Sequence, residues 1–526
     1  MIKKIILLML LICLMPQDNS ALAKEKILFV PHDNRPISYQ QTAEVIEQLG
    51  YEILLPPKKL LSVENSDSHT DELWAWLEKN SKSARAAVIA SDSMLYGGLI
   101  PSRKHEIDSE IISARVERFK KLHADNPRLK IYIFGSLMRT PHTGTAGDIE
   151  EPSYYAEYGE KIFKYTSLLD KQEISGLTVD DKNNLVYLEN SIPAEILSDW
   201  LERRNKNFAA TKKLIDFAND GVISYLIIGR DDNSPLSQTH RENRKLLAYA
   251  ENIPKTKFQS LAGIDEFNLL LLTRAVNEMR GTTPKIFIRY NKGKGAKTIP
   301  PFSAEPIGDS INDAVIILGG KVVDNPKRAD FVMLVNTDFY GDTFWAHNRK
   351  PDGTEFQPNL TPSASTKIFA DMVEDYVNAG YLVGVADINF ANGADNALMK
   401  ILHDKNLLFK LQSYAGWNTA TNSTGFALAT GVLAKNMSAE SKNKLLARRY
   451  LDDWAYQANI RTIVGNKLNP VSYYQFNDER AAVEAEETRL MNDFAKNNLP
   501  PFAFLRDLKV TNPWNRMFEC EIEFND

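Results

Sequence analysis

Cysteine is nearly absent from this chain of 526 residues, which contains only Cys13 and Cys520. Cys13 lies in an N-terminal segment that we expect to be removed, so Cys520 would remain alone. A single cysteine cannot form an intramolecular disulfide. Small disulfide-stabilised scaffolds are therefore excluded, and stability must come from apolar burial, for which a chain of this length has ample room.

Long apolar runs are also missing, apart from residues 5–15. Two lysines precede that run, and the small residues Ala21 and Ala23 follow it, as in a signal peptide. The run is shorter than the roughly 20 residues that span a bilayer. We expect residues 1–23 to be a cleaved signal peptide and the mature protein to be secreted, periplasmic or otherwise extracytoplasmic, without stable membrane insertion. A retained anchor or lipoprotein processing at Cys13 are the alternatives.

The chain has no excess of positive charge, with 63 Lys and Arg against 68 Asp and Glu and a net charge of −5. The expected signal peptide carries a net +1 from Lys3, Lys4 and Asp18, which leaves −6 for the rest. Nucleic-acid binding needs clustered Lys and Arg, so we expect no nucleic-acid partner.

Several cofactor motifs are absent as well. The sequence has no glycine-rich dinucleotide fingerprint, no phosphate loop and no Gly-x-Ser-x-Gly nucleophile turn. Its eight histidines are scattered and lack the spacing of metal ligands. We therefore expect no cofactor and no metal, and keep a metal-dependent hydrolase only as a minor alternative.

What the chain does contain is short apolar, β-branched runs alternating with longer amphipathic segments, the pattern of parallel strands joined by helices. The predicted strands are residues 27–30, 51–54, 86–90, 130–134, 224–228, 257–261, 285–289, 331–335, 381–386 and 408–413. Polar residues follow nearly every one, which favours a TIM-like (β/α)8 barrel with a helical C-terminal region. An open, doubly wound parallel sheet is the alternative.

The character of the sequence changes after about residue 430. We expect residues 24–430 to form the α/β barrel domain and residues 431–526 a helical C-terminal region with a small β addition. Charged amphipathic patterns at 437–462 and 478–497 predict its helices, and 502–510 and 517–524 predict its strands. Long loops at 140–153, 290–310 and 336–362 are rich in Gly, Pro, Thr and Asn, and we expect them to be lids or binding walls.

Adjacent carboxylates at Asp231 and Asp232 follow the strand at 224–228, where a turn can aim both at one ligand. Two carboxylates this close repel, so one tends to keep its proton, and such a pair can perform acid/base catalysis on acetal bonds. Ser234 with Pro235 also predicts a helix start here, and capping of that helix explains the carboxylates equally well.

Asp265 and Glu266 form a second adjacent pair after the next strand. The first pair, Asp231 and Asp232, resembles the adjacent acids of hexosaminidases that use substrate assistance, in which the first acid orients the acetamido group and its neighbour protonates the leaving oxygen. That resemblance implies Asp231 as the orienting residue and Asp232 as the acid. The ordinary two-carboxylate scheme would instead use Glu266 as nucleophile with Asp232 as acid. The sequence leaves both schemes open, and a simple helix start explains Asp265 and Glu266 too.

Other polar and aromatic residues follow predicted strands and would converge if the strand ends share one rim. A Trp flanked by amides and hydroxyls, as at Trp417, suits a sugar ring. Trp514 and Arg516 lie in a similar cluster, which packing of the C-terminal region explains as well. We expect these residues to bind substrate: Asp33, Asn34, Arg35, Asp92, Tyr96, Arg103, Arg139, Arg230, Asp265, Asp387, Asn389, Trp417, Asn418 and Asn422.

Five motifs in order along the chain carry a family resemblance. They are HDNRP at 32–36, SDSMLYGG at 91–98, GRDDNSP at 229–235, GWNT at 416–419 and PWNR at 513–516. Together they resemble an uncharacterised bacterial family described as a domain of unknown function. This resemblance implies no reaction.

The leading hypothesis from the residues is an exported glycoside hydrolase that acts on amino-sugar-containing glycans. The alternatives are a carbohydrate-binding or cell-envelope protein without turnover, and the metal-dependent hydrolase mentioned above.

Overall fold

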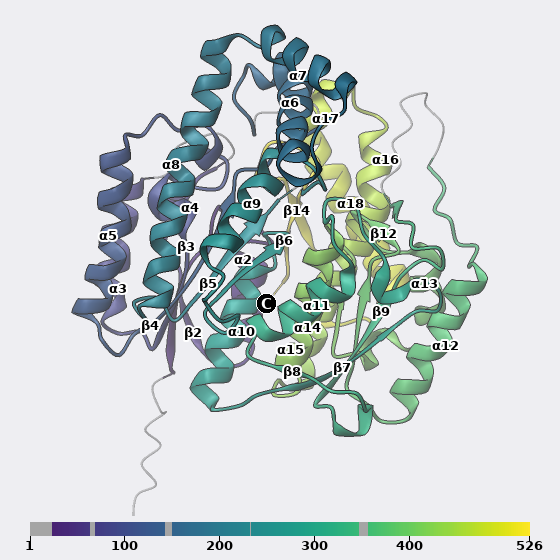
Figure 1. Ribbon diagram of the computed structural model, residues 1–526. Helices are drawn as coiled ribbons and strands as arrows, with labels where there is room; N and C mark the ends of the chain where they lie inside the picture. The colour runs from purple at the N-terminus through teal and green to yellow at the C-terminus, as the bar shows by residue number, and fades with distance from the viewer. Residues whose placement is uncertain (1–23, 64–68, 143–149, 232, 347–355, 526) are drawn as a thin grey trace, which may run out of the picture.

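Two separate parallel β-sheets form the framework of the protein, as a computed structural model shows (Figure 1). The structure describes residues 24–63, 69–142, 150–231, 233–346 and 356–525. The first sheet has the order β2-β1-β3-β4-β5-β6 and the second the order β13-β11-β9-β7-β8. All pairs within both sheets are parallel.

The first sheet and its helices occupy the N-terminal half of the chain. Its strands are β1 (Lys26–Val30), β2 (Glu52–Leu54), β3 (Ala86–Ala90), β4 (Lys130–Leu137), β5 (Tyr225–Arg230) and β6 (Phe258–Ala262). Its helices are α2 (Gln40–Glu47), α3 (Thr70–Ser81), α4 (Ser91–Leu95), α5 (Ser109–Asp125), α6 (Tyr155–Ser175), α7 (Val179–Ser191), α8 (Ala194–Asn219), α9 (Gln238–Tyr249) and α10 (Phe267–Arg280).

The second sheet follows in sequence. Its strands are β7 (Lys285–Tyr290), β8 (Lys321–Val322), β9 (Phe331–Asn336), β11 (Val383–Asp387) and β13 (Ser413–Ala415), with a small extra pair of β10 (Phe344–Trp345) and β12 (Phe390–Ala391). Its helices are α11 (Ile307–Ile317), α12 (Ala364–Asn378), α13 (Asn396–Asp404) and α14 (Ala420–Ala434).

The two sheets share one topology. In each, the strand that comes second in the chain lies at one edge, the first strand lies beside it, and the later strands follow in order. This is the doubly wound order in which ligands bind outside the carboxyl ends of the strands. The closed barrel that the sequence favoured is not formed by the described strands, which build two open sheets. Short polar segments after each strand do not distinguish these folds, because both place such segments at the carboxyl ends.

Alternating burial explains how the layers stack. Ile27 and Phe29 of β1 face the core between the sheets, which α10, α11 and α14 fill. Leu28 and Val30 face the outer helices α3, α5 and α8. Successive strand residues point to opposite faces, so both faces of each sheet are covered and apolar.

Residues after α14 form a helical region with one small hairpin. Its elements are α15 (Ala439–Arg449), the π-helix η6 (Tyr450–Ile460), α16 (Arg461–Gly465), α17 (Pro470–Tyr474), α18 (Arg480–Asn498), β14 (Lys509–Thr511) and β15 (Glu521–Glu523). Its apolar side chains pack mainly on the outer face of the second sheet. Ion pairing of Arg448 with Glu44 and a hydrogen bond from Gln41 Nε2 to Asp452 Oδ2 (2.8 Å) also tie it to the first half.

None of the helices in the described ranges is long and apolar enough to cross a membrane. The expected signal peptide lies outside these ranges.

Candidate active site

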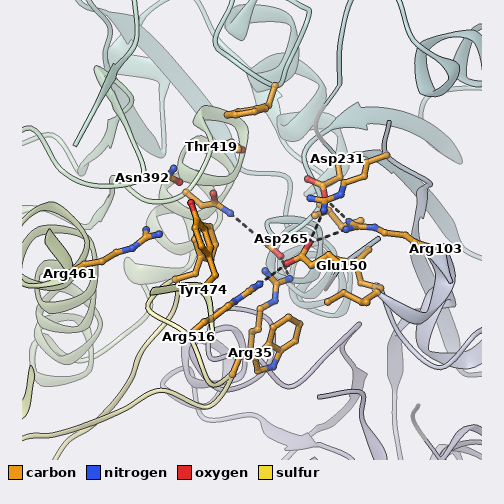
Figure 2. A pocket seen from close by; sticks show the side chains of 18 of the residues that line it. Arg35, Arg103, Glu150, Asp231, Asp265, Asn392, Thr419, Arg461, Tyr474 and Arg516 are labelled. Carbon is orange, nitrogen blue, oxygen red and sulfur yellow. Dashed lines mark hydrogen bonds and ion pairs between the residues drawn. The ribbon is translucent and has the colours of Figure 1, made fainter. Parts of the chain in front are cut away.

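A cavity of about 330 Å³ lies where the carboxyl ends of the strands meet the C-terminal region (Figure 2). Segments after β1, β3, β4, β5 and β6 contribute Arg35, Arg103, Arg139, Asp231 and Asp265 to its lining. Segments after β12 and β13 contribute Asn392, Asn418 and Thr419, and the C-terminal region contributes Arg461, Tyr473, Tyr474, Trp514, Arg516 and Phe518. The predicted gathering of polar residues from separate strand ends is therefore observed here.

One wall of the cavity is a network of carboxylates and guanidinium groups. Asp231 Oδ2 accepts from Arg103 Nη2 at 2.7 Å. Glu150 contacts three arginines: Arg103 at 3.1 Å, Arg139 at 3.2 Å and Arg516 at 2.8 Å. Burial alone would raise the pKa of Glu150, but the three positive charges outweigh it and hold the pKa well below the ordinary range. These ion pairs therefore hold the side chains of this cavity wall in place.

Asp265 lies at the base of the cavity (Figure 2). Its Oδ1 accepts from Arg35 Nη2 at 2.7 Å and lies 3.2 Å from His32 Nε2, and its Oδ2 accepts from Asn418 Nδ2 at 3.2 Å. Burial opposes ionisation, but Arg35 and His32 hold the pKa of Asp265 well below its ordinary value. Asp265 is therefore a charged, oriented carboxylate that faces the cavity.

Glu266, the next residue, has the opposite environment. It is buried, does not line the cavity, and neither carboxyl oxygen has a side-chain partner among the described residues. Burial raises the pKa of Glu266 well above its ordinary value; its own backbone N–H opposes this shift, and the charge of Asp265 adds to it. One protonated and one ionised carboxyl therefore lie side by side after β6.

Two glycines make room for Glu266. A Cβ on Gly263, whose φ is +101°, would lie 2.4 Å from Glu266 Oε1, and a Cβ on Gly425 in α14 would lie 2.6 Å from Glu266 Cβ. Only glycine combines this close approach with the positive φ at residue 263. Glycine at residues 263 and 425 therefore leaves the space that the Glu266 side chain occupies.

Two predicted residues after β1 support the cavity without lining it. Asp33 Oδ2 accepts from Arg35 Nε at 2.9 Å, and Asn34 Oδ1 accepts from Trp514 Nε1 at 2.6 Å. They orient the guanidinium and the indole that do face the cavity.

The predicted residues Asp92, Tyr96, Arg230 and Asn422 lie behind the cavity. Ser136 Oγ donates to Asp92 Oδ2 at 2.8 Å, and burial raises the pKa of Asp92 to about 6. Tyr96 stacks on His105, Arg230 pairs with Glu305 at 2.7 Å, and Asn422 is buried in α14. None of the four lines the cavity.

Asp387, Asn389 and Trp417 also do not line the cavity. Asp387 accepts from Asn336 and Tyr414, both at 2.9 Å, and burial together with the charge of Asp395 raises its pKa to about 7. Asn389 donates to Asp395 at 3.1 Å, and Trp417 packs in the core against Phe518. Asp387 and Asn389 are therefore linked through Asp395 at the carboxyl end of the second sheet, and Trp417 belongs to the apolar core.

Asp232 lies outside the described residues, so its predicted role stays a prediction. The helix start predicted at Ser234 is displaced: α9 begins at Gln238, and Ser237 is the N-cap, whose side chain accepts from His240 N. Ser234 instead hydrogen-bonds His142 at 2.8 Å. The Pro that follows Ser234 therefore belongs to the loop.

Several residues that line the cavity were not predicted from the sequence. Asn392 lies after the short strand β12, Arg461 lies at the end of the charged pattern at 437–462, which resembles a solvated surface, and Tyr474 lies in α17, for which no element was predicted. Glu150 and Phe302 lie in two of the long loops that were expected to form binding walls. The PWNR motif was the available signal for Trp514 and Arg516.

Among the described residues, no three His, Cys, Asp or Glu side chains gather in a way that could hold a metal ion.

Among solved structures, a crystal structure of a β-N-acetylhexosaminidase matches with 11% identity, covering 83% of this chain and 78% of that chain, at a TM-score of 0.16. Similarity at that TM-score supports no conclusion about fold or activity. None of the curated proteins matches the sequence. The family model described as "Protein of unknown function (DUF4127)" matches residues 27–523, as the five motifs indicated, and the chain belongs to this family.

Proposed function

We propose that the protein is an exported glycoside hydrolase that acts on amino-sugar-containing glycans by carboxyl catalysis in the cavity. The observation that carries the proposal is the placement of Asp231 after β5 and of Asp265 and Glu266 after the adjacent strand β6, the latter two in unlike environments. Glycosidases catalyse hydrolysis with two carboxyl groups whose environments give them different pKa values, so that one is protonated and the other ionised.

The geometry supports different roles for these carboxyls. Asp231 and Asp265 face the cavity, where a carboxylate can stabilise positive charge at the anomeric carbon or orient an acetamido group. Glu266 does not line the cavity, so a direct nucleophilic role for it has no support, and substrate assistance with Asp231 as orienting residue is the better supported scheme. Asp232 remains the proposed proton donor.

The rest of the lining suits a sugar. Trp514, Tyr474, Phe302 and Phe518 offer aromatic surface, and Asn418 and Thr419 offer neutral polar groups. The apolar face of a sugar ring stacks on aromatic side chains, while its hydroxyls need neutral donors and acceptors.

A glycan-binding protein without turnover is the second candidate. It is favoured by the pairing of Asp231 with Arg103 and of Asp265 with Arg35, because ion pairs hold carboxylates in place but also reduce their reactivity.

Hydrolysis of aryl N-acetylhexosaminides and of cell-wall glycan fragments by the purified protein separates the two candidates. Asp231→Asn and Asp265→Asn should each lower kcat/KM by about 100-fold or more. Asp313→Asn is a matched control, since the Asp313 side chain is 22% exposed and pairs with Lys255 at 2.6 Å, against 23% and 2.7 Å for Asp231 with Arg103. Sugar binding without turnover on any glycoside would support the second candidate instead.

A further inference from the structure

Arg461 is a buried cation that faces the cavity. It is the first residue of α16, is only 5% exposed, and lines the cavity on the side opposite Asp231 and Arg103 (Figure 2). Arg461 Cζ lies 4.7 Å from the ring centre of Phe518, which holds the guanidinium against the cavity wall.

The other arginines of the cavity all have carboxylate partners. Arg35 pairs with Asp265, Arg103 with Asp231, Arg139 with Glu151 and Arg516 with Glu150. Their charges are thus compensated within the protein.

Arg461 differs because it forms no ion pair with any described residue. Its Nε donates to Tyr473 Oη at 2.7 Å and its Nη1 donates to Gln457 Oε1 at 3.0 Å, and both acceptors are neutral. Two of its five N–H groups are used in this way, and the rest have no acceptor in the described part of the chain.

The carboxyl of Glu487 is close enough to sense the charge of Arg461, but it forms no ion pair with it. Burial raises the pKa of Glu487 to about 8, so this group is mostly uncharged near neutral pH. It therefore does not serve as the missing counter-charge.

An uncompensated buried charge is costly, and an anionic ligand group would remove that cost. Asn392 and Tyr474 lie on the same side of the cavity as Arg461, whereas Asp231 and Glu150 lie across it (Figure 2). The carboxylates and arginines across the cavity already pair with one another, so Arg461 is the cation of the described lining that is left to pair with an anion.

We propose that Arg461 binds a carboxylate carried by the sugar, so that the substrate is an acidic amino sugar or a glycan that contains one. This assignment rests on the proposed function, since it names the substrate class of the same cavity. The planar guanidinium matches a carboxylate with two parallel hydrogen bonds, which gives it geometric as well as charge selectivity.

Binding measured by calorimetry on the full-length mature protein tests this inference without requiring turnover. The probes are N-acetylmuramic acid and N-acetylglucosamine, which differ by a lactyl ether carboxylate, and inorganic phosphate as a competitor. The wild type should bind the acidic sugar at least about 10-fold more tightly, and Arg461→Gln should abolish that preference while leaving affinity for the neutral sugar unchanged.

Arg115→Gln is the matched control, because the Arg115 guanidinium also donates to a neutral acceptor, Leu95 O at 2.6 Å, and lies in α5 away from the cavity. Arg461→Lys keeps the charge and should retain part of the preference, which guards against misfolding of the Gln variant. Equal binding of the two sugars by the wild type, or an equal loss of both in Arg461→Gln with Arg461→Lys like the wild type, would overturn the inference. Phosphate binding tighter than that of the acidic sugar would also overturn it.

The same variants separate this inference from the proposed function. Arg461-dependent binding of the acidic sugar with no hydrolysis of any glycoside supports the inference and contradicts the hydrolase. Hydrolysis of an acidic and a neutral glycoside at equal rates, in the wild type and in Arg461→Gln alike, supports the hydrolase and overturns the inference.

Discussion

Neighbouring carboxyls in this protein often have opposite environments, and Glu486 and Glu487 in α18 show the consequence for stability. Burial raises the pKa of Glu487 to about 8, whereas a hydrogen bond from Arg489 lowers the pKa of the partly exposed Glu486 to about 2. A group whose folded pKa is raised stabilises the protein while it is protonated. That contribution declines as pH rises from the ordinary carboxyl range towards 8.

The first prediction follows from the loss of this stabilisation as pH rises. Glu487→Gln keeps an acceptor for Tyr456 and removes the need to hold a proton, so its melting temperature should fall less between pH 5 and pH 8 than that of the wild type. At pH 8 it should exceed the wild type by about 2–4 °C in calorimetry. Glu486→Gln is the control and should leave the slope unchanged. A wild-type melting temperature that rises over this range relative to Glu487→Gln would contradict the assignment.

The second prediction concerns Glu150, which contacts three arginines. Glu150→Gln should destabilise the fold by about 1–3 kcal/mol at pH 7 in urea unfolding, because buried guanidinium groups lose a counter-charge. Since the folded pKa of Glu150 is lowered, the stabilisation is present above the ordinary carboxyl range and is lost as pH falls below it. The difference from wild type should therefore shrink at pH 3.

Glu160→Gln provides the control for that measurement. Glu160 forms an exposed i,i+4 pair with Lys164 in α6, and such pairs contribute little. An effect of Glu150→Gln no larger than that of Glu160→Gln would show that the network does not stabilise the cavity wall.

At the scale of elements, strand positions were predictable because strands buried on both faces appear as short apolar runs. Nine of the ten predicted strands share three or more residues with observed ones. The tenth, at 408–413, is wrong over most of its length: residues 408–410 form a 3-10 turn and β13 begins at Ser413. Leu408 and Leu411 are buried for packing against the C-terminal helices, and such a run cannot be told from a strand by composition.

The way these strands assemble was less predictable. Pairing partners depend on contacts between residues far apart in sequence, and barrel and open sheets place the same polar residues after each strand. The sequence predicted the cavity residues that directly follow strands, such as Arg35 and Asp265. It did not predict Arg461 and Tyr474, because the packing of C-terminal helices brings them to the cavity. Asp387 and Trp417 also follow strand ends, as site residues do, but Asp387 accepts buried hydrogen bonds and Trp417 packs in the apolar core.

The third prediction tests the contact between α10 and α14 beside Glu266. Gly425→Ala places a Cβ 2.6 Å from Glu266 Cβ and Cγ, and should destabilise the protein by about 1–3 kcal/mol although alanine is the better helix former. Gly50→Ala is the comparison, since its φ is +89° and nothing lies within 4 Å, so that only backbone strain is added. Stabilisation by Gly425→Ala in chemical denaturation would contradict the close packing.

At the scale of the molecule, the two sheets share the helical layer between them. Leu270 of α10 and Leu428 of α14 belong to one apolar core together with residues of both sheets. A shared core couples the halves during unfolding, and the C-terminal region adds contacts to each.

The fourth prediction follows from that coupling. Leu270→Ala and Leu428→Ala should each lower the free energy of unfolding by about 2–5 kcal/mol and shift one common calorimetric transition. If either substitution separates the melt into two transitions, the halves are independent and the cavity between them is not held by a shared core.

The dependence of glycoside hydrolysis on pH tests the central claim most directly. A carboxylate with a lowered pKa working with a protonated acid predicts a bell-shaped profile of kcat/KM, and Asp265→Asn should abolish the activity across it while Asp313→Asn preserves both its height and its shape. A profile that is flat across the acidic range, or full activity in Asp265→Asn, would contradict catalysis by the carboxyls of this cavity.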